Sequence, residues 1–379
     1  MTDEPRYPPH YNAELIDQYE TFMRDQKAAH QASKPAMPEP EEKPKSEPGA
    51  AAMTTVPFEP AFFNPDDLTQ VPGVVGTLID WTVASALYPN RTLALGGALV
   101  TVGTLMGRRV MTPTRGVTHL YVVCVAESAT GKQHPADCLK EALTVAGTSR
   151  VLCGEIKSAA ALAKILSVQG PLVCAVIDEY GLVLDRLVRS NAISSETSLM
   201  SDMRKLWGTQ FGKQYHTAAT LDRPVELIYG PAFSIFALSV PEDVGAAFKS
   251  RQILGGFFNR HLYLIGDKRA PKQDPVPGNV PPLLAARLKA LGPPSAADAI
   301  LNQKASEIKS PKESKEEKPI PVPITAQVEL RWGPGAKAVW DQLESLTSEQ
   351  DRMKRTMFAR VSEMTVRLAS IVVLWPRDR

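Results

Sequence analysis

Apolar runs separated by short polar stretches dominate the middle of the chain. Residues 119–126, HLYVVCVA, form a β-branched run that predicts a buried strand, and the amphipathic segment 135–147 predicts a helix directly after it. Further buried strands are expected at 150–155, 171–181, 231–239 and 260–266, with helices expected at 158–170 and 241–254. Strands that are buried on both faces and alternate with helices predict a parallel α/β sheet.

The segments on either side of this core differ from it in amino-acid composition. Prolines and charged residues crowd two stretches, which bury too little apolar surface to offset chain entropy. The chain is therefore expected to divide into a disordered tail at 1–55 with a short helix at 13–27, a helical subdomain at 56–111, an α/β core at 112–267, a Pro-rich linker at 268–325 and a helical segment at 326–379.

Composition removes several classes of protein. Lys and Arg total 43 against 41 Asp and Glu, so the formal net charge is +2 and does not indicate a polyanion-coating protein. The four cysteines form no CxxC and no Cys/His cluster, which excludes zinc fingers and a disulfide framework and favours a reducing cytosol. No apolar run reaches the ~18 residues that a bilayer span needs, so we expect no membrane association.

The segment 126–133, AESATGKQ, follows the predicted strand and opens the predicted helix. It fits the phosphate-loop pattern at Gly131 and Lys132, but has Ala126 in place of the first Gly and Gln133 in place of the Ser/Thr. In this context the backbone N–H groups and the helix N-terminus would converge on a phosphate. The alternative is an ordinary strand-to-helix turn with an exposed lysine. The expected nucleotide contacts are Ala126, Ser128, Ala129, Thr130, Gly131, Lys132 and Gln133.

Two acidic residues end the apolar run at 171–177. Asp178 is expected to hold Mg²⁺, with Gln133 as a second candidate ligand, and Glu179 is expected to orient and deprotonate a water molecule. The alternative is an acidic pair that caps the next helix. Glu155 is a competing base, because it also ends a predicted strand; its own alternative is a loop glutamate before a Ser158 helix cap.

Five segments occur in a fixed order: VAESATGKQHP, GEIKSAAALAKIL, VIDEYG, FSIFALSVPEDV and GGFFNRHLYLIG. Together they resemble the P-loop ATPases of phages and prophages described as DNA helicase-like, often found beside primase domains. The resemblance spans about 62–375 and implies a three-layer RecA-like core in the bacterial cytosol. It further implies ATP and Mg²⁺ as cofactors, a homo-oligomer similar to hexameric helicases, and single-stranded DNA in a central channel.

The resemblance also implies roles for individual residues. Gly131 and Lys132 match the phosphate loop, Asp178 and Glu179 match the Walker B pair, Ser239 matches a sensor position, and Arg260 matches an arginine that completes a neighbouring subunit's site. Arg260 has a structural alternative, an ion pair with a carboxylate. The chain stops early in the family's C-terminal helical region, which suggests a truncated copy.

Basic and aromatic residues supply candidate DNA contacts, since channel loops need cations for phosphates and aromatic rings for stacking. The candidates are Arg108, Arg109, Arg115, Arg204, Lys205, Trp207, Lys213 and Arg251. The segment 203–216 has this mixture, and the alternative there is a solvated helix with Trp207 in the core. Three functions stay open: a helicase motor, a non-motor ATPase such as a loader or packaging factor, and a degenerate nucleotide-binding scaffold.

Overall fold

The structure is a computed structural model that describes nine parts of the chain. These are residues 68–189, 194–217, 227–248, 255–266, 269–276, 278–292, 326–345, 355–356 and 358–373. The expected tail at 1–55, its helix at 13–27, the greater part of the expected linker and the candidate DNA contact Arg251 lie outside the described residues.

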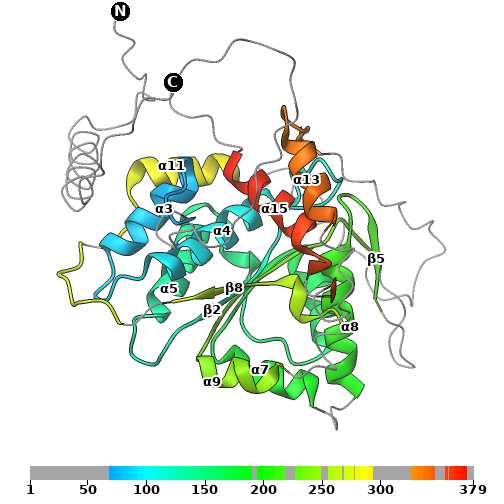
Figure 1. Ribbon diagram of the computed structural model, residues 1–379, viewed down its shortest axis with the longest axis horizontal. Coiled ribbons are helices and arrows are strands. Elements are labelled where there is room, and N and C mark those ends of the chain that lie inside the picture. Colours follow the sequence, from blue (N-terminus) through cyan, green and yellow to red (C-terminus); the bar gives the residue numbers. More distant parts are fainter. Residues whose placement is uncertain are drawn as a thin grey trace, which may run out of the picture.

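Five parallel strands form the central sheet, in the order β3–β4–β7–β2–β8. Their bounds are β2 Tyr121–Val125, β3 Leu152–Cys153, β4 Leu172–Ile177, β7 Ala232–Ser239 and β8 His261–Ile265. In Figure 1, β2 and β8 lie side by side in the middle of the molecule. Every residue of β2 and β7 is buried, as expected for strands covered on both faces. The predicted parallel α/β sheet is confirmed.

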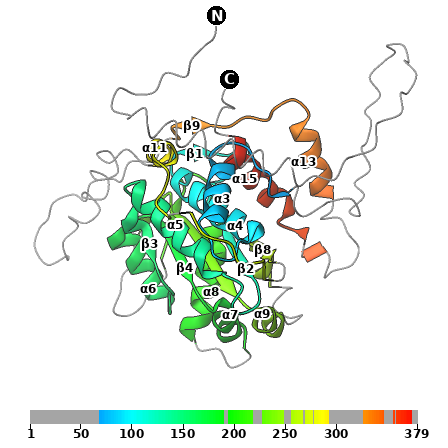
Figure 2. The same cartoon turned by 90° about the vertical axis from the view of Figure 1, so that its left-hand side faces the viewer.

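Helices cover both faces of this sheet, which gives three layers (Figure 2). Alternate residues of β2 show the two sides. Cys124 faces Gly96 of α4 (Arg91–Met106), whereas the Tyr121 hydroxyl donates a 2.9 Å hydrogen bond to the carbonyl of Met203 in α8 (Ser194–Gly208). Helices α3 (Gly73–Ala84) and α5 (Gln133–Val145) pack beside α4, and α6 (Ala159–Lys164) and α7 (Tyr180–Val188) pack beside α8.

Small residues let α4 approach the sheet closely. A Cβ atom at Gly96 would lie 2.7 Å from the Cys124 sulfur, and one at Gly103 would lie 2.6 Å from the Thr118 carbonyl oxygen. At the start of the helix, the Asn90 side chain accepts a 3.0 Å hydrogen bond from the Leu93 amide. Helices α3 and α4, predicted as a helical subdomain, thus share one hydrophobic core with the sheet.

The segment predicted as a Pro-rich linker contains a helix, so that prediction was wrong for residues 282–291. Helix α11 (Pro282–Leu291) begins with a proline at its first turn, where no backbone N–H is needed. Leu284 and Leu288 lie one helical turn apart and are both fully buried. Local proline content therefore concealed a helix whose stability comes from tertiary packing.

The remaining elements are short or lie near the end of the chain. The C-terminal segment is helical as predicted, with α13 (Ala336–Ser345) and α15 (Val361–Val373), and α15 packs on α4. Before it, β9 (Val328–Glu329) pairs in parallel with β1 (Val110–Met111). The hairpin β5 (Gln214–His216) and β6 (Leu227–Tyr229), helix α9 (Pro241–Ala247), and single turns at Ser149–Val151, Ile165–Gln169 and Phe258–Arg260 complete the described elements.

Among the described helices, none has both the length and the apolar character that crossing a bilayer demands.

Candidate functional site

The candidate phosphate loop connects the carboxyl end of β2 to the start of α5. Its backbone alternates in hand: Ala129 has φ 61° and Gly131 has φ 81°, while Thr130 between them is not in the positive-φ region. Successive residues of alternating hand turn their N–H groups toward one side and make a concave anion-binding nest. Helix α5 begins at Gln133, directly after Lys132, so the helix N-terminus opens onto the same loop.

Contacts beneath the loop hold this shape. The buried Thr130 hydroxyl donates a 2.7 Å hydrogen bond to the Glu127 carbonyl, and the Ala126 amide donates to the Ser239 carbonyl at 3.1 Å. A Cβ atom at Gly131 would lie 2.9 Å from the Tyr88 carbonyl oxygen, so glycine is required there for space as well as for φ. Residues 127–129 are left exposed at the rim of the loop.

The acidic pair follows β4, two strands away from the loop. Asp178 and Glu179 are both exposed, and Asp178 Oδ1 accepts a 2.9 Å hydrogen bond from the Glu179 amide. Glu179 has φ 51° and ψ 40°, a left-handed conformation that costs a non-glycine residue about 1 kcal/mol. The Glu179 side chain makes no capping bond to α7, so helix capping does not account for it.

Sheet order decides how far this pair lies from the loop. Only β7 separates β4 from β2, and the registers Ile177↔Ala237 and Val125↔Ser239 bring the two strand ends to nearly the same level. Two strand spacings amount to about 10 Å. A triphosphate with its cation can bridge that gap, so the arrangement suits a nucleotide held between the loop and the pair.

Ser239, the predicted sensor, ends β7 between the loop and the acidic pair. Its hydroxyl is buried and accepts a 3.0 Å hydrogen bond from the Gly181 amide in the first turn of α7. A Cβ atom at Gly181 would lie 2.6 Å from that hydroxyl oxygen. Ser239 therefore joins α7 to β7 in this structure, and a sensor role stays a prediction.

Glu155, the competing candidate for the catalytic base, is engaged in an ion pair away from the loop. Glu155 forms an ion pair with Arg186 of α7. Its strand, β3, lies three strands from β2, which is about 14 Å. Glu179 is therefore both nearer to the loop and free of the ion pair that engages Glu155.

Of the two candidate metal ligands, Gln133 has a side-chain partner on its own helix, whereas Asp178 is exposed. The Gln133 amide nitrogen donates a 3.3 Å hydrogen bond to Asp137 one turn along α5, whereas Asp178 is exposed directly after the last residue of β4. Within the described part of the chain, no three His, Cys, Asp or Glu side chains gather to hold a metal ion. Mg²⁺ bound through substrate phosphates needs only one or two protein carboxylates, which fits Asp178.

The predicted DNA contacts separate into two groups. Trp207 is 1% exposed, so stacking of a base on its ring is ruled out and the alternative of a helix with Trp207 in the core is correct. Several cations serve the fold: Arg108 binds the Gly230 carbonyl, Arg109 binds the carbonyls at the end of α11, and Lys205 pairs with Asp202. Arg115 and Lys213 are exposed, and a hydrogen bond from the Phe211 amide to the Arg115 carbonyl brings their two loops together.

Arg260 lies at the opposite end of the sheet from the phosphate loop. It immediately precedes β8, whose first residue is level with the first residue of β2, while the loop follows the last residue of β2. Two further arginines near it, Arg360 and Arg367, were not predicted from the sequence. The signal was present, since both lie on one face of an otherwise apolar helical pattern, seven residues apart.

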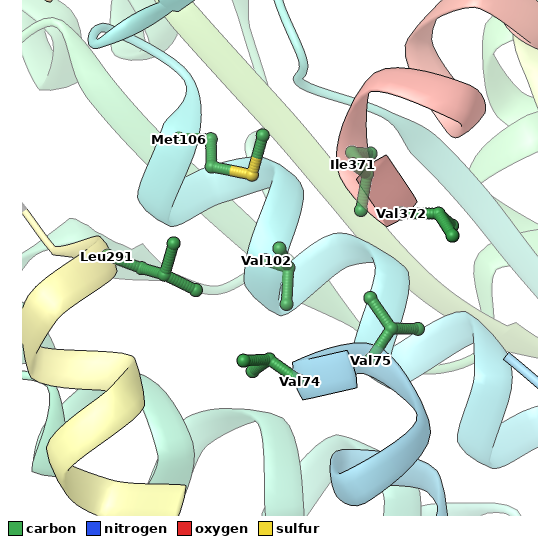
Figure 3. Close-up of a pocket in the computed structure, with 7 residues that line it drawn as sticks. All are labelled: Val74, Val75, Val102, Met106, Leu291, Ile371 and Val372. Carbon is green, nitrogen blue, oxygen red and sulfur yellow. The ribbon is translucent and has the colours of Figure 1, made fainter. Parts of the chain in front are cut away.

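Figure 3 shows a pocket between α3, α4, α11 and α15. Its lining is entirely apolar: Val74, Val75, Val102, Met106, Leu291, Ile371 and Val372. Because no polar side chain lines it, this pocket offers no residue for acid–base or phosphate chemistry.

No family model matches this chain, and no curated protein matches it. The fold defines an α/β protein with a five-stranded parallel sheet between helical layers.

Proposed function

We propose that this chain is an ATP-dependent motor of a phage or prophage that acts on single-stranded DNA during replication. The observation that carries the proposal is the alternating backbone at Ala129 and Gly131. This loop leads into a helix after Lys132, and only β7 separates its strand, β2, from β4 with its acidic end. Parallel α/β sheets bind ligands at this end of their strands.

The residues take the following roles in the proposal. The loop N–H groups and the Lys132 ammonium bind phosphate oxygens, Asp178 ligates Mg²⁺, and Glu179 orients a water molecule and accepts its proton. ATP with Mg²⁺ supplies a phosphoanhydride bond whose hydrolysis drives movement along the strand. The proposal includes a homo-oligomer, a hexamer by analogy, with a primase as a replication partner in the host cytosol.

A second candidate is a scaffold that binds nucleotide without hydrolysing it. Two observations favour it: the Gln133 amide is engaged with Asp137, and the Ser239 hydroxyl is engaged with the α7 backbone. The Ser239 hydroxyl is thereby occupied, and the Gln133 side chain is held along α5 through its amide nitrogen. A non-motor ATPase such as a loader or packaging factor uses the same site, and differs only in not displacing a strand.

Titration calorimetry with ATP and Mg²⁺, together with a turnover assay, tests the site. We expect the wild type to bind and hydrolyse ATP, and Lys132→Ala to weaken binding at least tenfold. Glu179→Gln should retain binding and lose turnover, whereas the matched variant Glu155→Gln should retain both. Turnover retained in Glu179→Gln and lost in Glu155→Gln would reassign the base.

The remaining outcomes separate the candidates. Binding without turnover in the wild type favours the scaffold, and turnover without displacement of a strand from forked DNA favours the non-motor ATPase. If the wild type and Lys132→Ala bind ATP equally, the phosphate-loop assignment is wrong.

A further inference from the structure

Three arginines converge on the indole ring of Trp207, and a fourth lies close to one of them. The guanidinium carbons of Arg260, Arg360 and Arg367 lie 5.7, 5.8 and 4.0 Å from the centre of the ring. Arg204, one helical turn before Trp207 in α8, donates a 2.9 Å hydrogen bond to the Gly255 carbonyl, next to the turn that ends at Arg260. We call Arg204, Arg260, Arg360 and Arg367 the arginine cluster.

The positive charge of the cluster is poorly compensated. Arg367 pairs with Glu363 at 3.2 Å. Arg204 and Arg260 bond to the uncharged oxygens of Gly255, Gly256 and Asn259, and across the described ranges neither of them nor Arg360 forms an ion pair. Burial, followed by repulsion from Arg360 and Arg204, lowers the pKa of Arg260 to about 10. Like charges gathered in a partly desolvated place favour a bound anion.

This cluster is separate from the nucleotide site. It adjoins the first residue of β8, His261, which is level with Tyr121 at the start of β2. The phosphate loop begins after Val125, four residues or about 13 Å further along the strand. In Figure 1, α15 reaches from the α4 side of the molecule toward α8, and the Arg367 hydrogen bond to the Trp207 carbonyl joins the two.

The surroundings of the cluster favour a nucleic-acid strand over a free anion. Guanidinium groups match phosphate oxygens with paired hydrogen bonds. Phe358 is 36% exposed and lies two residues before Arg360. The Asn259 amide donates a 2.6 Å hydrogen bond to the Thr356 carbonyl, which holds this segment against the turn before β8. Cations with an exposed aromatic ring bind strands whose bases are free to stack.

We propose that the arginine cluster binds the phosphodiester groups of single-stranded nucleic acid, with a base stacked on Phe358. Arg204, Arg260 and Arg360 contact the phosphates, and the buried Arg367 holds Trp207 and α15 in position. The inference rests on the proposed function only in taking a single strand as the partner, and it assigns that partner a site of its own.

Fluorescence anisotropy of a labelled single-stranded oligonucleotide, without nucleotide, tests this. The double variant Arg204→Gln/Arg360→Gln should bind at least tenfold more weakly, and the slope of log affinity against log salt should fall by about 1.4, the value for two lost phosphate contacts on a single strand. The charge-matched control Arg150→Gln/Lys164→Gln, at exposed positions near β3, should stay within about twofold.

Phe358→Ala should weaken binding several-fold and leave the salt slope unchanged, because a stacked base carries no counterion. Thermal unfolding of each variant identifies any loss of fold. The inference is overturned if the arginine variant binds like its control, if Phe358→Ala binds like the wild type, or if inorganic phosphate displaces the oligonucleotide at equal phosphate concentration.

Two further variants distinguish the strand-binding site from the proposed nucleotide site. Lys132→Ala should bind the oligonucleotide like the wild type, so failure of the nucleotide site leaves the strand site standing. Arg260→Gln should weaken strand binding; if it retains strand affinity and loses ATP turnover, Arg260 completes a nucleotide site in a neighbouring subunit and is not a strand contact.

Discussion

The side chain of Arg367 joins three separate segments of the molecule. It is 1% exposed, and its guanidinium donates to the carbonyls of His119 at 2.9 Å and Trp207 at 2.6 Å while pairing with Glu363. It thereby ties α15 to the segment before β2 and to the end of α8. A buried cation is tolerated here because each of its three nitrogen atoms donates a hydrogen bond to an oxygen, one of them to a carboxylate.

Removing this side chain should be costly. We expect Arg367→Ala to lower the free energy of unfolding by about 3–5 kcal/mol, because Glu363 and two buried carbonyls lose their partner. Urea unfolding measures the change, and Arg355→Ala, at an exposed position before α15, should change it by less than about 0.5 kcal/mol. A loss below about 1 kcal/mol for Arg367→Ala would show that α15 is not held in this way.

At the scale of elements, α11 shows that proline content does not decide local order. Ten residues inside a stretch that was expected to be a linker form a helix against α3, α4 and α5. Its start is compatible with proline, and its two buried leucines supply the apolar contact that a short helix needs.

The packing of α11 can be measured with one truncation. Leu288 is fully buried, so Leu288→Ala should lower the free energy of unfolding by about 2–5 kcal/mol through lost burial and the cavity left behind. The neighbouring exposed Lys289→Ala is the matched control and should have little effect. Equal, small effects for the two variants in urea unfolding would mean that α11 does not belong to the core.

Across the whole molecule, buried histidines link stability to pH. Burial lowers the pKa values of His119 and His261, to about 4 for His261, although a hydrogen bond from His261 to the Phe257 carbonyl opposes the shift. A histidine with a lowered pKa in the folded state contributes stability that is full above its unfolded pKa of about 6.5 and is lost as pH falls toward the folded value.

We therefore expect His261 to lower the free energy of unfolding by about 2 kcal/mol between pH 7 and pH 5, and His119 to act in the same direction. Urea unfolding at both pH values measures the total, and the ring-proton resonance of His261 should not titrate above pH 5. A stability that is flat from pH 7 to pH 5 contradicts the lowered pKa values.

Much of the fold could be predicted from the local pattern of apolar and polar residues. All five strands of the sheet fall within predicted apolar segments, and residues 126–132 were correctly placed between a strand and a helix. The local sequence pattern gave a wrong prediction where tertiary packing outweighed it. Proline content concealed α11. At 203–216 the sequence left two interpretations open, a DNA contact or a helix with Trp207 in the core, and the amphipathic α8 turns that ring into the core.

The amino-acid sequence alone determined a parallel α/β sheet and a phosphate-loop candidate, because burial on both strand faces and the backbone demands of Gly131 are local properties. Only the tertiary structure decided that β7 lies between the loop and Glu179, and that Glu155 pairs with Arg186. It also decided that Arg260, Arg360 and Arg367 meet around one indole ring. Such contacts join residues far apart in the chain, and they depend on how all the elements pack together, which no local pattern records.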